Sequence, residues 1–359
     1  MEQVKKLLLE LVRSGLWGTE VRLSAYHTID FAKVLDMATG QAVVGLAAAG
    51  LEQVKDVKIP KAAVLPMIGQ TLQVEQRNKT MNEFIASLVE KMRSAGIEAV
   101  LVKGQGVAQC YEKPLWRPSG DVDLLLSEAN YRKAKEFLLP LSSARKKEER
   151  YSRHWGMNIG QWYVEIHGSL RSGLSTRVDR AIDAVQNEVF EKGRVRSWMN
   201  GETKVLLPAP DEDVFLVFTH FVKHFYKEGM TLRQVCDWCR LLWTYRSVLD
   251  VALQERWLRQ AGLMDEWQAF AALAVDYLGM PEKSMPFYEP RFKAKGSQLV
   301  AFILDGYSGN KFNDIWQIAR IFPWKAVRYA PSIFLNVNWL KVRERLFKSD
   351  GYTIDNKNN

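Results

Sequence analysis

The apolar pattern changes twice along this chain, and these changes restrict its possible folds more than any other feature. Short runs of β-forming residues, among them 99–102 and 121–126, lie between about residues 97 and 167 and alternate there with helical segments. Before and after this part, apolar residues recur at the spacing of amphipathic helices, as in 81–92 and 214–225. Strands and helices mixed within ~100 residues are typical of an α/β or α+β domain. The sequence therefore predicts an α+β fold, a small mixed β-sheet flanked by N-terminal and C-terminal helical regions.

The same changes predict the domain organisation. We expect an N-terminal helical region over residues 1–96, a catalytic core over 97–207, a C-terminal helical domain over 208–350 and a flexible tail over 351–359. The glycines in 15–18 are expected to break the first amphipathic stripe.

Further elements follow from local patterns. In the core we expect two more strands, near 157–159 and 161–167, and a helix over 128–138. After residue 170 we expect helices, with Asp211 as the cap of the first one beyond Pro210. The later helices are expected over 231–246, 249–261 and 265–278.

Composition limits the class of protein. The 359 residues are 47% hydrophobic and 25% charged, the balance of a globular protein, which excludes a wholly disordered or collagen-like chain. Three cysteines are too few for a disulfide framework and indicate a reducing compartment. No apolar run approaches the ~18 residues of a membrane span, and the N-terminus lacks the apolar core of a signal peptide. We therefore expect a cytoplasmic protein without a transmembrane segment.

Two aspartates in the second expected strand are the strongest chemical signal. Asp121 and Asp123 alternate with apolar residues, so both carboxylates project from one face of the strand. Two carboxylates on one face are costly unless water or cations compensate them, and Mg²⁺, which prefers oxygen ligands, would do so. A solvated strand edge with chance acids is the simpler alternative. Glu165 can bring a third carboxylate to the same place, which makes the minimal set for two Mg²⁺ ions, with Mn²⁺ as an alternative.

Residues after the first strand have the features of a phosphate-binding turn. Gly104 and Gly106 flank Gln105 where the strand passes into a helix, and backbone N–H groups can approach a phosphate there. Lys103 or Arg117 would add a positive charge. A tight turn without a ligand is the alternative.

The candidate site residues follow one another along the chain in the same order as the motifs of a known sequence pattern. Its members here are Leu101-Val102-Lys103-Gly104, then Arg117, then Asp121-Val122-Asp123-Leu124-Leu125, then Val164-Glu165-Ile166-His167. Over about residues 75–260 the chain resembles a bacterial family of nucleotidyltransferases of the DNA polymerase β-like superfamily. The resemblance implies two metals held by Asp121 and Asp123, with Glu165 completing the catalytic one. It also implies that Glu165 helps to orient or deprotonate the incoming hydroxyl.

One position departs from the superfamily pattern. Members usually have Gly-Ser or Gly-Gly after the first strand, with the aspartates soon afterwards, whereas here Gln105 follows Gly104 and Asp121 lies 17 positions beyond Gly104. Lys103, or the backbone of Gln105 and Gly106, would then replace the missing serine in contacting the triphosphate.

Several other polar residues have two interpretations each. His167 should share the face of Glu165, where it would contact a phosphate, carry a proton or make a structural hydrogen bond. Arg233 and Asp237 would line the substrate cleft, as the resemblance implies, or form an i,i+4 ion pair. Four residues have a zinc-like spacing inside apolar helical runs, where core or capping histidines and packing cysteines are favoured over zinc. They are His220, His224, Cys236 and Cys239.

The positive charge is concentrated near the C-terminus. Residues 311–350 hold eight Lys or Arg against three acids, and so supply +5 of the formal net charge of +9. The aromatics there would stack nucleobases or lie at an anionic membrane surface, but core packing beneath a basic face is favoured. These aromatics are Trp316, Phe322, Trp324, Tyr329, Phe334, Trp339 and Phe347.

Together these residues predict a Mg²⁺-dependent nucleotidyltransferase. It would bind a nucleoside triphosphate, most simply ATP, transfer the nucleoside monophosphate to an acceptor and release pyrophosphate. The acceptor class stays open among small molecules, peptides, proteins and RNA. Two alternatives are a nucleic-acid-binding or RNA-modifying protein of the same fold and a nucleotide-binding module without turnover.

Overall fold

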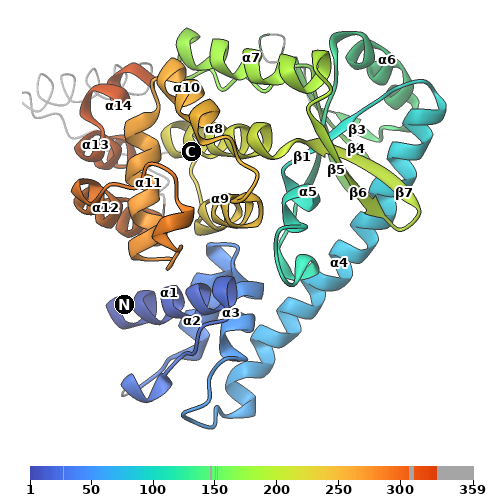
Figure 1. The fold of residues 1–359 in the computed structure, drawn as a ribbon. Coiled ribbons are helices and arrows are strands. Elements are labelled where there is room, and N and C mark those ends of the chain that lie inside the picture. Colours follow the sequence, from blue (N-terminus) through green and yellow to red (C-terminus); the bar gives the residue numbers. More distant parts are fainter. Residues whose placement is uncertain (27, 146–147, 150, 152, 307–310, 330–359) are drawn as a thin grey trace, which may run out of the picture.

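The computed structural model describes residues 1–26, 28–145, 148–149, 151, 153–306 and 311–329. The N-terminal helices, the sheet and the C-terminal helices occupy three corners of the molecule in Figure 1. The N-terminal helices are α1 (Glu2–Trp17), α2 (Phe31–Gly40) and α3 (Val44–Leu51), and the long α4 (Lys61–Ser94) leads from them to the sheet. Helix α1 continues through Gly15, so the predicted break comes only at Gly18.

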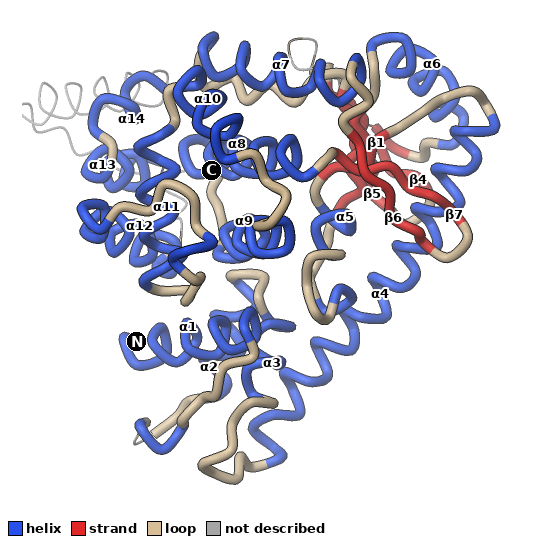
Figure 2. The backbone as a smooth tube through the Cα atoms, viewed as in Figure 1, coloured by secondary structure: helices blue, strands red, loops and turns tan. Residues whose placement is uncertain are grey.

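The sheet has the order β3-β4-β5-β2-β1-β7-β6. Figure 2 shows its strands in red, gathered in one part of the molecule. Pairs β2–β5 and β1–β7 are parallel and the other neighbours are antiparallel, which confirms the predicted mixed sheet flanked by helices. The strands are β1 (Val100–Val102), β2 (Asp121–Leu125), β3 (Ala144–Arg145), β4 (His154–Ile159), β5 (Trp162–His167), β6 (Val195–Asn200) and β7 (Thr203–Pro208).

The alternation of side chains along β2 determines which face of the sheet carries Asp121 and Asp123. Leu124 belongs to the apolar cluster that the sheet shares with α4 and α6 (Glu128–Leu138). Leu125 belongs to a small cluster on the opposite face, with Val189 of α7 (Thr176–Glu191). Because successive strand residues point to opposite faces, Asp121 and Asp123 share the face of Leu125, away from α4.

The β6–β7 hairpin corrects the expectation of helices alone after residue 170. Strand β6 carries the polar residues Arg196 and Ser197 in succession, so it lacks an apolar alternation that would have marked it. Asn200 pairs with Thr203 across a two-residue turn, and Gly201 there has a φ of +62°. Two-residue hairpin loops need a positive φ at their first position, which glycine adopts easily, and Gly201 was the local sign of this element.

The C-terminal helices follow the predicted order. They are α8 (Pro210–Lys227), α9 (Leu232–Tyr245), α10 (Val251–Ala261), α11 (Met264–Asp276), α12 (Lys293–Asp305), α13 (Lys311–Ile321) and α14 (Pro323–Tyr329). The bounds of α9, α10 and α11 differ from the expected ones by a few residues. The expected cap is wrong: Ala209 is the N-cap of α8, and the Asp211 carboxylate instead accepts a hydrogen bond from the backbone N–H of Asp250.

Short elements complete the chain. The five-residue helix α5 (Gly104–Ala108) follows β1. Single 3₁₀ turns lie at Leu23–Ala25, Pro114–Trp116, Leu139–Leu141, Glu282–Ser284 and Pro290–Phe292.

Aromatic packing holds the C-terminal helices together. Trp238 of α9 meets Trp267 of α11 edge to face, with ring centroids 4.5 Å apart, and Phe218 of α8 packs on both. These side chains are fully buried, which explains the apolar helical spacing in this part of the sequence.

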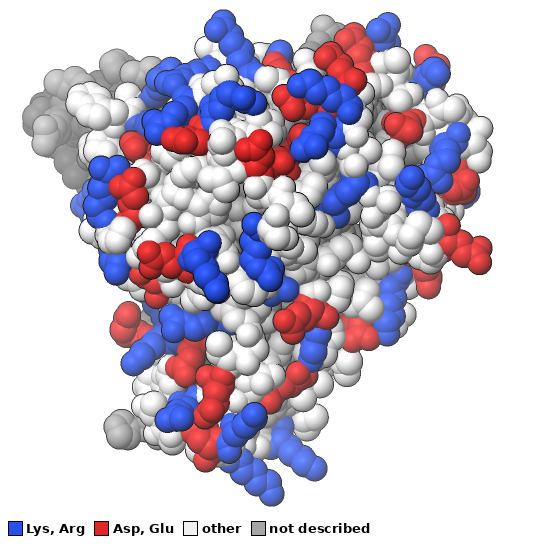
Figure 3. All heavy atoms as spheres, viewed as in Figure 1, with Lys and Arg blue, Asp and Glu red and all other residues white. Residues whose placement is uncertain are grey.

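The basic C-terminal segment is described only as far as residue 329. Phe322 and Tyr329 are buried, as the core interpretation predicts, whereas the Trp324 side chain on α14 is 87% exposed. The aromatics Phe334, Trp339 and Phe347, and the tail 351–359, lie outside the described residues. On the face drawn in Figure 3, positive and negative side chains are interspersed. Among the described residues, no helix has the length and apolar character to cross a bilayer.

Candidate active site

Three carboxylates from two adjacent strands meet at one place. Strand β2 carries Asp121 and Asp123, and its parallel neighbour β5 places Glu165 directly opposite Asp123. One carboxylate oxygen of each residue lies within 4.8 Å of those of the others. The convergence expected from the sequence is therefore present, and we refer to these residues as the acidic triad.

Asp123 is the most buried member and has two basic neighbours. Its Oδ1 accepts a hydrogen bond from Lys103 Nζ at 2.8 Å and lies 2.7 Å from His167 Nε2. Burial alone would raise the pKa of the Asp123 carboxyl, but Lys103 and His167 outweigh burial and hold this pKa below its usual range. Asp123 is therefore ionised.

Asp121 differs from Asp123 because no described residue donates a hydrogen bond or forms an ion pair with its carboxylate. The negative charge of Asp123, and then burial, raise the pKa of Asp121 above its ordinary value. Lys103 and Arg233 oppose this rise from beyond ion-pair distance. Two carboxylates that repel each other fit a divalent cation, which would relieve this repulsion.

The turn between β1 and α5 brings Lys103 to the triad. Lys103 has φ +60° and ψ −146°, a backbone conformation that is rarely adopted by residues other than glycine. Such strain costs roughly 1–3 kcal/mol and persists where the surrounding structure holds it. Gly104 follows Lys103, and both residues line the cleft onto which the acidic triad opens. A Cβ atom on Gly104 would lie 3.4 Å from Ser119 Oγ.

Gln105 and Gly106 lie away from the cleft. The Gln105 side chain is buried and donates from Nε2 to Asn78 Oδ1 of α4 at 2.8 Å. A Cβ on Gly106 would lie 2.8 Å from a methyl of Leu207, so a glycine here lets α5 pack against β7. The predicted contact of their backbone N–H groups with a phosphate stays a prediction.

Arg117 and Asp237 form a buried pair. The guanidinium donates from Nε and Nη2 to the two carboxylate oxygens of Asp237, both at 2.7 Å, and Tyr111 also donates to this carboxylate. Arg233, which the i,i+4 alternative paired with Asp237, instead donates to the Pro118 carbonyl oxygen at 2.8 Å. Arg117 thus joins the segment before β2 to α9.

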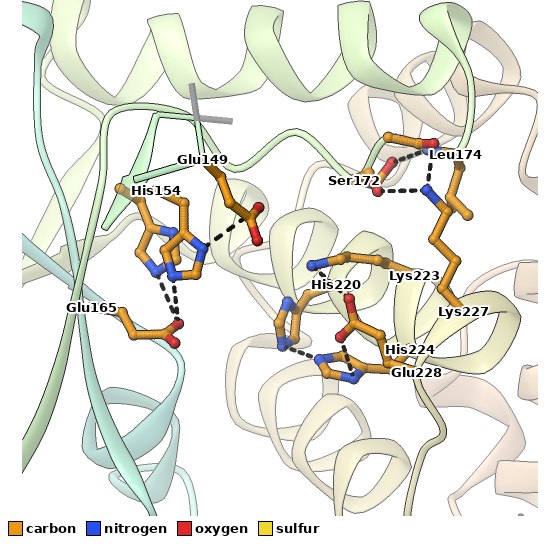
Figure 4. A network of polar contacts seen from close by, with 12 residues as sticks. Glu149, His154, Glu165, Ser172, Leu174, His220, Lys223, His224, Lys227 and Glu228 are labelled. Carbon is orange, nitrogen blue, oxygen red and sulfur yellow. Dashed lines mark hydrogen bonds and ion pairs between the residues drawn. The ribbon is translucent and has the colours of Figure 1, made fainter. Parts of the chain in front are cut away.

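The acidic triad opens onto a polar cleft of about 620 Å³ between the sheet and the C-terminal helices. Figure 4 shows residues from both sides: His154 and Glu165 come from the sheet, and Lys223 and Lys227 come from α8. Among the described residues, two cations of the lining have no ion-pair partner, Lys227 and Arg233. Both donate to backbone carbonyl oxygens, and the cleft therefore combines the acidic triad with two cations that no carboxylate neutralises.

His154 is a site residue that sequence reasoning missed. It lies opposite His167 in the β4–β5 ladder, and the two rings stack with centroids 4.7 Å apart and an interplanar angle of 3°. His154 Nε2 lies 3.1 Å from Glu165 Oε2, and this carboxylate raises the pKa of His154, whereas burial lowers the pKa of His167. Lys223, Lys227 and Ser119 were missed as well, because single polar residues in helices and turns carry no local signal.

The zinc-like set does not form one cluster. His220 and His224 of α8 line the cleft with their Nε2 atoms 3.0 Å apart. Cys236 and Cys239 are fully buried in α9, where burial raises the pKa of both thiols, as packing cysteines would behave. Within the described part of the chain, neither cysteine belongs to a group of potential metal ligands.

Comparison with known proteins places the chain in a family. Residues 27–279, more than half of the chain, match a family described as uncharacterised nucleotidyltransferase, a wider span than the resemblance at 75–260. No curated protein and no solved structure gives a match. The match includes β2, β5 and the cleft, and the chain therefore belongs to this family of uncharacterised nucleotidyltransferases.

Proposed function

We propose that this protein is a Mg²⁺-dependent nucleotidyltransferase with the catalytic arrangement of the DNA polymerase β-like superfamily. The observation that carries the proposal is the convergence of Asp121, Asp123 and Glu165 at the open cleft. Membership of a nucleotidyltransferase family supports the same class of reaction. The donor is a nucleoside triphosphate, most simply ATP, and the products are a nucleotidylated acceptor and pyrophosphate.

The acidic triad supplies the oxygen donors for the metal. Among the described residues, Asp121 has no hydrogen-bond or ion-pair partner, and Asp123 contacts Lys103 and His167 through Oδ1 alone, which leaves Oδ2 for an ion. Mg²⁺ prefers such oxygen ligands, and Mn²⁺ accepts them as well. Bound ions would neutralise phosphate charge and polarise the attacking and leaving oxygens.

The cations of the cleft supply contacts for the phosphates. Lys227 and Arg233 reach the cleft without carboxylate partners, and Lys103 and Gly104 border the triad. The Ser119 hydroxyl, close to Gly104, is the candidate for the contact that the superfamily serine would make. These groups would hold the triphosphate beside the carboxylates, so that positioning and electrostatics provide most of the rate enhancement.

The reaction breaks one bond and forms one. An acceptor oxygen attacks the α-phosphorus, the bond from this phosphorus to the oxygen that leads to the β-phosphate breaks, and pyrophosphate leaves with that oxygen. The proton of an acceptor hydroxyl passes to Glu165, which lies next to the ring nitrogens of His154 and His167.

The position of a radioactive label tests this reaction. Wild-type protein, Mg²⁺ and a cell extract are incubated with each of ATP, GTP, CTP and UTP, labelled on the α- or the γ-phosphate. We expect α-label on an acceptor and γ-label in pyrophosphate, and both should stop when EDTA removes the metal.

Other outcomes separate the alternatives. Transfer of γ-label to the acceptor would contradict the proposal, because it indicates a phosphotransferase. Mg²⁺-dependent nucleotide binding without pyrophosphate release, with every acceptor source tried, would favour the module without turnover. Tight binding of RNA that weakens steeply with salt would favour the nucleic-acid-binding alternative.

Removal of the Arg233 guanidinium, which has no carboxylate partner among the described residues, should lower the efficiency with which the protein uses the nucleotide. Arg233→Ala is expected to lower kcat/KM for the nucleoside triphosphate by ~10–100-fold, because a charge-assisted hydrogen bond contributes about 1.5–3 kcal/mol. Lys133→Ala is the matched control, since Lys133 is exposed on α6 outside the cleft, and it should leave kcat/KM unchanged. Equal activity of Arg233→Ala and the control would contradict a role of Arg233 in nucleotide binding.

A further inference from the structure

A second group of possible metal ligands lies beside the acidic triad. Glu165 belongs to both groups, and the second adds the ring nitrogens of His154 and His167. One donor atom of each residue lies within 4.8 Å of the others. The group therefore offers two imidazole nitrogens and one carboxylate oxygen as possible ligands of a single ion.

The strand register creates this arrangement. Antiparallel pairing of β4 and β5 sets His154 opposite His167, and the rings are nearly parallel. The Nε2 atom of His154 faces the Glu165 carboxylate, and Nε2 of His167 lies near the carboxylates of both Asp123 and Glu165 (Figure 4 labels His154 and Glu165). The Nε2 atoms lie 3.1 Å and 3.7 Å from Glu165 Oε2. Ligands held at ~2.0–2.2 Å from one ion have similar spacings, so the donors need only small movements to share an ion.

The surroundings also have the features of a metal site. Glu149 Oε2 lies 3.8 Å from Nδ1 of His154, on the ring edge away from Glu165, where ligating histidines commonly have a carboxylate neighbour. Lys103 contacts Asp123, and among the described residues it makes no ion pair with Glu165. An ion at the histidine side would thus replace the 2.7 Å contact of His167 Nε2 with Asp123 Oδ1 but keep the Lys103–Asp123 contact.

Donor chemistry selects the ion. Imidazole nitrogen suits first-row transition ions, whereas Mg²⁺ prefers oxygen and keeps much of its water. We propose that His154, Glu165 and His167 form a nitrogen-containing subsite that binds a first-row transition ion such as Mn²⁺ in preference to Mg²⁺. The catalytic meaning of this subsite rests on the proposed function, because Glu165 would join it to the Asp121–Asp123 ions, but the binding itself can be measured without nucleotide.

Titration of the metal-free full-length protein tests the subsite. In calorimetry, we expect wild-type protein to bind Mn²⁺ at least ~10-fold more tightly than Mg²⁺. In pulsed electron paramagnetic resonance, bound Mn²⁺ should show modulation from directly coordinated ¹⁴N.

Three variants locate the signal. His154→Ala and the more conservative His154→Gln should each lose most of the preference for Mn²⁺ and weaken the ¹⁴N modulation. His224→Ala removes another imidazole of the same cleft and should change neither readout. Circular dichroism of each variant verifies its fold, and His154→Gln decides the matter if the alanine variant misfolds.

Two results would overturn the subsite: Mn²⁺ bound without ¹⁴N coupling, or an unchanged Mn²⁺ preference in folded His154→Gln. The outcomes also separate this inference from the proposed function. If bound Mn²⁺ shows no nitrogen coordination but the protein transfers α-label in a Mg²⁺-dependent reaction, the subsite is rejected and the proposed function stands. Nitrogen-coordinated Mn²⁺ in a protein that transfers no label with either ion rejects the transferase and retains the metal site.

Discussion

Asp123→Asn is expected to lower the rate of α-label transfer by at least ~10³-fold while the protein stays folded. Asparagine keeps the size of the side chain but removes the charge that Asp123 contributes to the acidic triad. The fold should tolerate this change, because the loss of the Lys103 ion pair is offset by the loss of repulsion from Asp121. Initial rates of transfer and the thermal unfolding midpoint measure the two effects separately.

Controls make this result specific. Asp36→Asn changes an exposed aspartate on α2 and should keep the full rate. Glu165→Ala should be as inactive as Asp123→Asn, since both remove a member of the triad. Label transfer that persists in folded Asp123→Asn would eliminate the proposed mechanism.

Arg117→Met should destabilise the protein by about 3–5 kcal/mol, because it leaves the Asp237 carboxylate buried without its cation. Arg117 and Asp237 are 6% and 5% exposed, so water cannot replace the lost partner. The double variant Arg117→Met/Asp237→Leu removes both charges and should recover most of the lost stability. Urea unfolding followed by tryptophan fluorescence provides the comparison.

Activity of the double variant then gives the role of Arg117. If Arg117 acts by holding α9 to the segment before β2, the restabilised double variant should keep KM for the nucleotide within a few-fold of wild type. A large rise in KM together with recovered stability would mean that the guanidinium contacts the nucleotide, as the sequence analysis predicts. Equal stability of wild type and Arg117→Met would contradict the importance of the buried pair.

Local patterns were sufficient to predict the strands that carry the acids. Alternation placed Asp121 and Asp123 on one face of a strand, and the same rule applied to Glu165 and His167. Their meeting depends on the parallel pairing of β2 with β5, which lie about 40 residues apart, and no local pattern gives that register. The resemblance to a family pattern supplied this information instead.

The position of His154 could have been found from the hairpin geometry. Strands β4 and β5 join through Gly160 and Gln161, so paired residues lie symmetrically about this turn and His154 faces His167. The expected strand began only at residue 157, because the charged residues before it resemble a turn. Polar site residues at a strand end thus conceal the strand that carries them.

Contacts between distant segments were beyond sequence reasoning. The Arg117–Asp237 pair joins residues 120 positions apart, and a nearer partner for Asp237, Arg233, was available in the same helix. The bidentate geometry of the buried guanidinium favours Arg117 over a neighbour one turn away. Such a choice depends on tertiary packing, which only the structure gives.

Anomalous diffraction from crystals grown with Mn²⁺ and a non-hydrolysable nucleoside triphosphate analogue tests the central claim most directly. The account predicts manganese peaks within coordination distance of the carboxylates of Asp121, Asp123 and Glu165, with the α-phosphate of the analogue beside them. An analogue bound with its triphosphate elsewhere, and no manganese at these three carboxylates, would contradict it.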